Sequence, residues 1–497
     1  MVSLWLAVLV SVPLACSKPM ETARPVAQVR SVANPVAAQF AGELRERVTA
    51  AAMLDHLTAL DKIAETNGGN RAAGSIGYDA AVDYVVATLR DAGYDVQTPE
   101  FELGLFTAEN PVLTVGGAAI ESYALKYSLG TPAQGVSGPL VAAPAGETPG
   151  CTPAEFDGLD VSGAVVLVDR GGCPFPDKQA VAADLGAVAL VVANNVEGGF
   201  LAATLGEKTD VQIPVVSVGK DDGAGLRAAP GPTTLVLDAR TERFTVRNVI
   251  AQTKTGSPQD VVMVGAHLDT VPEGTGVNDN GSGVVAVLET AVQLGNAPDI
   301  NHAVRFGFWG AEEVGIIGSR KYLQSLDIEQ LKDIALYLNF DMLASPNAGY
   351  FTYDGNQSTT LGRDDLIPRV PEGSAGIERT LVDYLRAEGK PAQDTAFDGR
   401  SDYEPFTRAG IPAGGLFAGA DGNKTAEQAE LWGGTADAPF DAGYHTGDDT
   451  ISEIDKEALG IQGGGVAYAA GMYAQDLTGR NGVPDREDRT RHWLAEQ

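Results

Sequence analysis

Histidine and carboxylate side chains recur in five short segments of the C-terminal half of the chain. In order, they are His267-Leu-Asp269, Asn278-Asp279-Asn-Gly-Ser-Gly, Glu312-Glu313, Asn339-Phe-Asp341-Met342 and Tyr444-His445. One His-x-Asp pair alone is weak evidence, because structural histidines are common, but five segments together are more specific. Imidazole and carboxylate ligands suit Zn²⁺, and of two adjacent glutamates one can hold metal while the other acts as a base. The segments therefore predict a metal centre with a carboxylate base beside it.

These segments must be brought together by the elements that carry them. From residue 248 onward, apolar strand-like runs alternate with helical runs. The strand-like runs are 261–266, 303–309, 334–340 and 413–417, and the helical runs are 283–294, 319–326, 376–388 and 460–474. This alternation predicts an α/β fold with a mostly parallel mixed sheet flanked by helices on both faces. Ligand sites in such folds lie at the carboxyl edge of the strands, where three of the segments fall.

A different pattern separates this region from the helical residues before it. Amphipathic helical spacing runs from about 41 and again over 81–93, and residues 96–103 alternate like a strand. Between 105 and 245, short apolar runs are separated by Gly, Pro and Asp turns, with one clear helix at 177–185. We interpret 105–245 as a compact β-rich insert, with 41–104 and 246–478 forming the catalytic domain on either side.

The insert resembles the protease-associated (PA) domain. The matching residues are Gly163-Ala-Val-Val-Leu-Val-Asp-Arg-Gly-Gly-Cys173-Pro-Phe, Lys178-Gln-Ala and Gly186-Ala-Val-Ala-Leu-Val-Val-Ala-Asn. The resemblance implies a non-catalytic module that acts as a lid or steers substrates or partners.

The five segments, taken in order, resemble the co-catalytic dizinc aminopeptidases of the bacterial leucyl aminopeptidase type. The resemblance implies two Zn²⁺ per chain, bridged by Asp279. It further implies that His267 and Asp341 bind one ion and that Glu313 and His445 bind the other. The remaining implied roles are Glu312 as general base, Asp269 as the residue that orients His267, and Tyr444 as the donor to the oxyanion.

The expected substrates are peptides with a free N-terminus. Segments around Arg400 and Phe417 resemble those that line the substrate pocket in this family, and Met342 adds an apolar side chain for Leu, Met or Phe residues. Met342 and Phe417 fit a plain core position equally well by residue type. Relatives often have a disulfide beside the last histidine ligand, and this loop lacks one. Asp448-Asp449 in that loop is expected to be solvated, with calcium binding as the alternative.

Composition restricts the partners. The chain has 35 Lys and Arg against 66 Asp and Glu, a net charge of −31, which disfavours nucleic acid. Residues 1–16 read as an export signal whose Cys16 resembles a lipidated lipoprotein cysteine, the alternative being an ordinary cleaved signal peptide. Residues 17–40 are expected to form a flexible tether, and 479–497 a loose polar tail. We expect export to the bacterial periplasm, the outer membrane as a lipoprotein, or the medium, with membrane contact only through the lipid.

Two further cysteines, Cys151 and Cys173, stand in the insert. In an oxidising compartment they are expected to form a disulfide, while two free buried thiols remain the alternative.

Three functions compete for this sequence. Removal of N-terminal residues fits all five segments. A PA-bearing carboxypeptidase of the same family is the alternative, although such enzymes carry a long helical C-terminal domain and this chain ends soon after its last helical run. A non-catalytic peptide-binding protein is disfavoured because Glu312, Glu313 and His445 are all present, and a glutaminyl cyclase is not expected with this insert.

Overall fold

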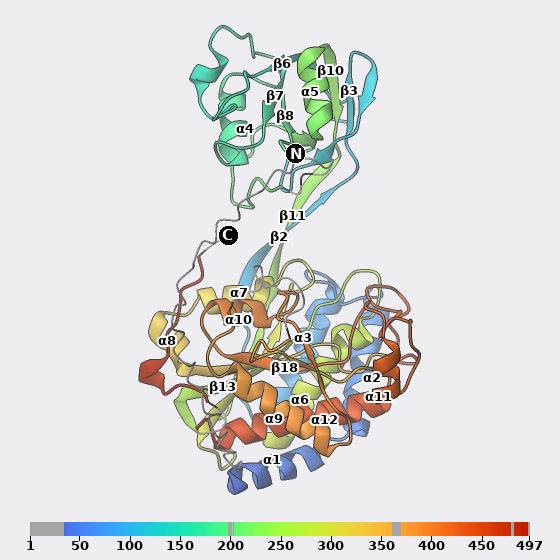
Figure 1. Cartoon of the computed structure of the whole chain (residues 1–497), viewed down its shortest axis with the longest axis vertical. Coiled ribbons are helices and arrows are strands. Elements are labelled where there is room, and N and C mark those ends of the chain that lie inside the picture. Colours follow the sequence, from blue (N-terminus) through green and yellow to red (C-terminus); the bar gives the residue numbers. More distant parts are fainter. Residues whose placement is uncertain (1–33, 197–200, 202, 360–368, 479–481, 496–497) are drawn as a thin grey trace, which may run out of the picture.

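The computed structural model describes residues 34–196, 201, 203–359, 369–478 and 482–495. Figure 1 shows two bodies joined by a two-stranded ribbon of β2 (Glu100–Ala108) and β11 (Ala239–Arg247), which pair antiparallel along their whole length. The expected domain limits at 104/105 and 245/246 fall inside these two strands. The predicted strand at 96–103 is divided between β1 (Val96–Gln97), which joins the larger body, and β2.

The larger body contains an eight-stranded mixed sheet with the order β1-β12-β14-β13-β15-β18-β16-β17. The central strands β14 (His302–Trp309), β13 (Ser257–His267), β15 (Ile334–Phe340) and β18 (Ala413–Phe417) are parallel. Antiparallel pairing begins on either side, at β12 (Val249–Gln252) and β16 (Phe351–Tyr353), and β17 (Gln393–Thr395) ends the sheet. The continuous burial of β15 is typical of a parallel strand covered on both faces.

Helices cover both faces of this sheet, so the predicted fold class is confirmed. One core contains Val262 and Val264 of β13 and residues of α2, α3, α6, α9 and α12. The other contains Met263 of β13 and residues of α7, α8 and α10. The helices of this body, in chain order, are α1 (Pro35–Arg47), α2 (Ala50–Thr66), α3 (Ile76–Asp91), α6 (Gly283–Leu294), α7 (Ile317–Gln324), α8 (Ile328–Asp333), α9 (Ser374–Ala387), α10 (Tyr403–Arg408), α11 (Ala426–Trp432) and α12 (Lys456–Gln475).

Three consecutive glycines let α12 approach its neighbours closely. A Cβ atom on Gly463 would lie 2.4 Å from the Met53 sulfur, and one on Gly465 would lie 2.5 Å from a methyl carbon of Leu416 in β18. Glycine is unfavourable inside a helix, so these positions are explained by packing rather than by helix propensity.

The insert forms a second eight-stranded sheet with the order β4-β3-β10-β6-β7-β8-β9-β5. Its strands are β3 (Val112–Val115), β4 (Ala118–Ile120), β5 (Tyr123–Ala124), β6 (Val136–Ala142), β7 (Val165–Asp169), β8 (Ala189–Ala193), β9 (Val215–Val218) and β10 (Pro232–Val236). The predicted helix corresponds to α4 (Phe175–Asp184), and a second helix, α5 (Lys220–Ala228), was not predicted. Four of its first six residues are Gly or Asp, and they hide the helical pattern that ends in Leu226.

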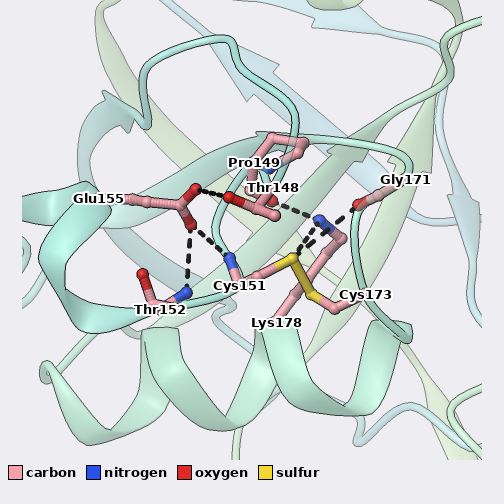
Figure 2. Close-up of a disulfide and its surroundings, with 8 residues drawn as sticks. All are labelled: Thr148, Pro149, Cys151, Thr152, Glu155, Gly171, Cys173 and Lys178. Carbon is pink, nitrogen blue, oxygen red and sulfur yellow. Dashed lines mark hydrogen bonds between the residues drawn. A yellow bond between two sulfur atoms is a disulfide. The ribbon is translucent and has the colours of Figure 1, made fainter.

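Cys151 and Cys173 are bonded in the insert, with an S–S distance of 2.02 Å (Figure 2). Glu155 accepts hydrogen bonds from the backbone N–H groups of Cys151 and Thr152 at 2.7 and 3.1 Å. The buried Lys178 ammonium donates to the carbonyl of Pro149 and lies 3.6 Å from the Cys151 sulfur. The disulfide thus ties the loop after β6 to the loop that follows β7.

Both ends of the described chain differ from expectation. Residues 35–40, predicted as part of the tether, are helical because Asn34 caps α1 and Ala37 and Ala41 are buried. Cys16 and the rest of 1–33 lie outside the described residues. The tail over 482–495 is packed rather than loose, since Arg489 is only 3% exposed and donates to Asp260 at 2.6 Å. Among the described residues, no helix has the length and apolar character needed to cross a membrane.

Candidate active site

The candidate metal ligands meet at the carboxyl edge of the central strands. His267 is the last residue of β13, Asp341 follows β15, and the glutamate pair follows β14 after a short turn. Because these strands are parallel and adjacent, their ends deliver the side chains to one edge. Asp279 comes from the glycine-rich turn before α6, and His445 from the loop before α12.

Asp279 lies between the two histidines. Its Oδ1 is 3.3 Å from Nε2 of His267, and its Oδ2 is 3.1 Å from Nε2 of His445. The same nitrogen of His267 lies 3.3 Å from Asp341 Oδ1, and that of His445 lies 3.0 Å from Glu313 Oε2. The five side chains therefore form two groups that share one carboxylate.

The donor set fits metal ions. His267, Asp279 and Glu313 each offer a ligand atom, and these atoms all lie within 4.8 Å of one another. Glu313 Oε1 and Asp341 Oδ1 are buried and accept no hydrogen bond from any residue that the structure describes. Buried acceptors without a partner are costly, and a cation at this position would satisfy them.

The protonation equilibria of the metal-free site follow from burial and crowding. Burial, followed by the charge of Asp279, raises the pKa of Glu313 to about 7, and burial raises the pKa of Glu312 well above its usual range. Hydrogen bonds to Asp279 and Glu313 raise the pKa of His445 to about 10. Without metal, Glu312 and Glu313 therefore bind protons near neutral pH more readily than ordinary glutamates. Bound cations would favour the ionised form of both.

Asp269 differs from its expected contact. Its carboxylate oxygen lies 3.8 Å from Nδ1 of His267, while its own backbone carbonyl oxygen is closer, at 3.1 Å. The two carboxylate oxygens instead accept the backbone N–H groups of Glu312 at 3.1 Å and Glu313 at 3.2 Å. Asp269 therefore fixes the turn that carries the glutamate pair, as well as lying beside the histidine.

Tyr444 and Arg400 lie at the mouth of the site. A guanidinium nitrogen of Arg400 donates to the Tyr444 hydroxyl at 3.2 Å, and the Tyr444 ring stacks on His445 with centroids 3.8 Å apart. Burial raises the pKa of Tyr444, so the phenol keeps its proton at neutral pH. With its lone pair engaged by arginine, the hydroxyl can donate toward a substrate oxygen.

The remaining predicted substrate residues line the cavity that contains the candidate ligands. Met342 is buried, Phe417 is partly buried, and both line the same cavity as the five candidate ligands and Glu312. Tyr353, Ala396 and Ala420 add apolar surface to it. Of the catalytic candidates, Asp269 alone is set behind this lining, where it is fully buried.

Asp449 was expected to be solvated and is instead buried, at 5% exposure. Its carboxylate accepts the backbone N–H groups of Asn278 at 2.7 Å and Asp279 at 2.9 Å. This contact joins the loop of His445 to the turn of Asp279, so the loop is pinned without a disulfide. Its exposed neighbour Asp448 shows why residue type alone did not separate the two.

Two other supporting residues escaped the sequence analysis. Arg71, fully buried, donates to the carbonyl oxygens of Leu268 and Gly276, each at 3.2 Å, and so holds both ends of the loop after β13. Ser401 donates to Asp341 Oδ2 at 2.6 Å. Ser401 lies next to Arg400 in the sequence, but no sequence pattern marked Ser401 or Arg71 as a residue that supports the ligands.

Comparison with known families divides the chain as the fold does. Residues 248–470 match the model of peptidase family M28, and residues 136–226 match that of the PA domain. The probable lipoprotein aminopeptidase LpqL of Mycobacterium tuberculosis is 64% identical over 469 residues, which is 94% of each chain. An aminopeptidase of Pseudomonas aeruginosa is 40% identical over 432 residues, covering 84% of this chain and 79% of the relative.

Solved structures give the same result at lower identity. The aminopeptidase from Aneurinibacillus sp. strain AM-1 has a TM-score of 0.61 and 27% identity, covering 88% of this chain and 96% of that one. A zinc aminopeptidase from Bacillus subtilis has a TM-score of 0.53 and 26% identity, covering 88% and 97%. With a relative this similar over nearly its whole length, the chain belongs to peptidase family M28 and is a metallopeptidase of the aminopeptidase type that carries a PA domain.

Proposed function

We propose that this enzyme is an exported dizinc aminopeptidase that removes large apolar residues such as Leu from the N-terminus of peptides. The observation that carries the proposal is the pair of ligand groups sharing Asp279 beside an apolar pocket. Zinc is favoured because the donors are two imidazoles and three carboxylates, and because relatives of similar fold are zinc aminopeptidases.

In this proposal each ligand group would hold one ion. His267 and Asp341 would complete one site, Glu313 and His445 the other, and Asp279 would contribute one oxygen to each. When bound, two zinc ions in such a site polarise the substrate carbonyl and acidify a water molecule. The orphaned oxygens of Glu313 and Asp341 are the atoms that most need these cations.

The protein groups would then handle the protons and the oxyanion. Glu312, which lines the site and is largely buried, would take a proton and deliver it to the leaving amine. Its raised pKa in the metal-free protein agrees with a carboxyl group able to hold a proton. Tyr444, held by Arg400, would donate to the oxyanion. Asp269 would keep Glu312 and His267 in place.

The pocket gives the proposed specificity. Met342 and Phe417 would contact the side chain of the N-terminal residue, while the carboxylates that line the pocket would attract its α-ammonium group. Arg400, exposed at the rim, would face the substrate backbone. A free N-terminus is therefore part of the recognition, and an acetylated peptide is expected to be a poor substrate.

Export, with lipidation at Cys16, is supported by two observations. The Mycobacterium tuberculosis relative is named a probable lipoprotein aminopeptidase. The Cys151–Cys173 disulfide requires an oxidising compartment to form and persist.

Hydrolysis of Leu-, Phe-, Lys- and Glu-p-nitroanilides, before and after chelation and with zinc restored, tests the proposal. We expect release from Leu and Phe that chelation abolishes and zinc restores, with two zinc ions per chain by elemental analysis. Cleavage of N-blocked peptides from the carboxyl end, with no release from any p-nitroanilide, would identify a carboxypeptidase instead.

A further inference from the structure

A second cavity lies in the insert, far along the chain from the metal ligands. It has a volume of about 580 Å³ and opens at the carboxyl ends of β7 and β8, beside α5 and the loop after β6. The strands β6, β7, β8 and β9 are parallel, so this is the edge at which open α/β sheets bind ligands. A cavity of this size accommodates a ligand as large as a short peptide.

The cavity concentrates positive charge in an acidic molecule. Residues 105–245 contain 16 Asp and Glu but only 8 Lys and Arg. Three of these eight cations, Arg170, Lys220 and Arg227, line the cavity, against the single carboxylate of Asp169. An even spread of charges would put about twice as many carboxylates as cations there. The lining thus has the opposite sign to the domain around it.

The two arginines are held in position by their neighbours. Arg227 donates to Asp169 Oδ1 at 2.8 Å and to the carbonyl of Ala143, so its charge is fixed to the end of β7. Arg170 donates one N–H to Asn194 Oδ1 at 3.2 Å, and Asn194 is buried. A guanidinium carries five N–H donors, and one such bond orients the group while leaving donors for a ligand.

Apart from Asn194 and Asn195, the rest of the wall consists of small residues. Three of them, Ala145, Gly146 and Pro149, belong to the loop that the disulfide anchors. Ala193, Ala224 and Ala228 complete it from β8 and α5. Small side chains allow the backbone of a bound segment to approach closely.

We propose that this cavity binds a carboxylate of a peptide, either its C-terminal group or an acidic side chain. Guanidinium groups pair with planar carboxylates in bidentate geometry, which a fixed arginine favours. A polyanion would be repelled by the surrounding acidic surface, whereas a short peptide with one or two carboxylates would not. The site would give the enzyme affinity for peptides independently of the side chain at their N-terminus.

The test measures binding without catalysis. Isothermal titration calorimetry of the full-length enzyme with acetyl-Ala-Leu-Ala-Glu is compared with the same peptide as a C-terminal amide and with Gln replacing Glu. The blocked N-terminus keeps these peptides from being aminopeptidase substrates. Chromatography after each titration shows whether they stay intact, so a failure of the proposed function, such as carboxypeptidase cleavage, is recognised separately.

We expect the double variant Arg170→Gln/Lys220→Gln to bind the free acid about tenfold more weakly than the wild type, since two charge contacts are lost. The matched control is Arg240→Gln/Arg243→Gln, which removes the same charge from exposed positions of β11 and should keep the affinity within about twofold. If the wild type binds only the C-terminal amide more weakly than the free acid, the site recognises the C-terminal carboxylate. If it binds only the Gln peptide more weakly, the site recognises the Glu side chain. Equal affinity of both double variants, equal affinity of all three peptides, or no binding at millimolar concentration would overturn the proposal.

Discussion

At the scale of single residues, burial and neighbouring charges determine the pKa values of the acidic groups in this site. Asp279 accepts from a histidine on each side, and those contacts outweigh the effect of its burial and lower its pKa to about 2. Burial raises the pKa values of the neighbouring Glu312 and Glu313, and for Glu313 burial and the charge of Asp279 outweigh its contact with His445. Of these side chains, Asp279 is thus the one that stays ionised without metal, which suits a residue proposed to hold two cations.

Substituting Glu312 separates catalysis from metal binding. Glu312→Gln should retain both zinc ions, because the five proposed ligands remain, while kcat falls by a factor of about 10² to 10⁴ through loss of the base. Elemental analysis and Leu-p-nitroanilide kinetics check this. Loss of zinc from the variant would show that the roles of Glu312 and Glu313 are exchanged.

Asp449 offers a test of support from outside the ligand set. Asp449→Ala removes the acceptor for the backbone of Asp279, and zinc affinity should fall by about 10- to 100-fold, as for other partners of metal ligands. Competition with a zinc-binding dye measures this directly. The exposed Asp448→Ala serves as the control, and equal affinities for the two variants would contradict the assigned contact.

His302, at the start of β14, should make stability sensitive to pH. Burial lowers the pKa of His302 below its usual 6.5, and its Nδ1 finds no partner among the described residues. As pH falls below 6.5 the unfolded chain takes up the proton first, so the native state loses stability through this group. Thermal denaturation from pH 7 to 5 should therefore show wild type losing more stability than His302→Gln. Parallel curves would refute this contribution.

At the scale of elements, close packing decides which residues a helix tolerates. Gly463 and Gly465 in α12 lie against Met53 and Leu416, whereas a Cβ on Gly42 in α1 would meet nothing within 4 Å. The same residue type is therefore required by packing in one helix and only unfavourable in the other. The parallel strand β15 and the part of β13 from Val261 onward likewise owe their burial to the helices on both sides.

Alanine substitutions at these glycines should change stability in opposite directions. Gly465→Ala should destabilise the protein by about 1–3 kcal/mol through overpacking, despite better helix propensity. Gly42→Ala should stabilise it by about 0.5–1 kcal/mol, because alanine loses less backbone entropy. Urea denaturation measures both, and a stabilising Gly465→Ala would show that α12 can move away from β18.

At the scale of the whole molecule, two bodies have separate cores and are connected by the β2–β11 ribbon (Figure 1). The metal site lies wholly in the larger body, and the disulfide and the cationic cavity lie wholly in the insert. Their stabilities are therefore expected to be separable, since each sheet buries its own faces.

Removing the disulfide tests this separation. Cys151→Ser/Cys173→Ser should destabilise the insert by about 3 kcal/mol, because the bond closes a loop with a sequence separation of 22. Calorimetry should show one transition shifted down and the other, assigned by its response to added zinc, unchanged. An equal shift of both transitions would mean that the two bodies unfold as one unit.

The sequence by itself determined the alternation of strands and helices, the family, the position of the insert and the candidate ligands. Hydrophobic periodicity and the order of His267, Asp279, Glu313, Asp341 and His445 along the chain sufficed, because both are local patterns. The structure then shows these five side chains at one edge of one sheet.

Tertiary structure alone decided which polar residues support that edge. Asp448 and Asp449 are adjacent residues of the same type, so the sequence does not distinguish them. Only packing buries Asp449 against the backbone of Asp279 and leaves Asp448 exposed. Arg71 acts on a loop about 200 residues further along, and Asp269 turns its carboxylate to the glutamate turn. The packing of the tail through Arg489 and the helix at 35–40 were missed for the same reason. Their partners are distant in the sequence, and burial is a property of the folded chain.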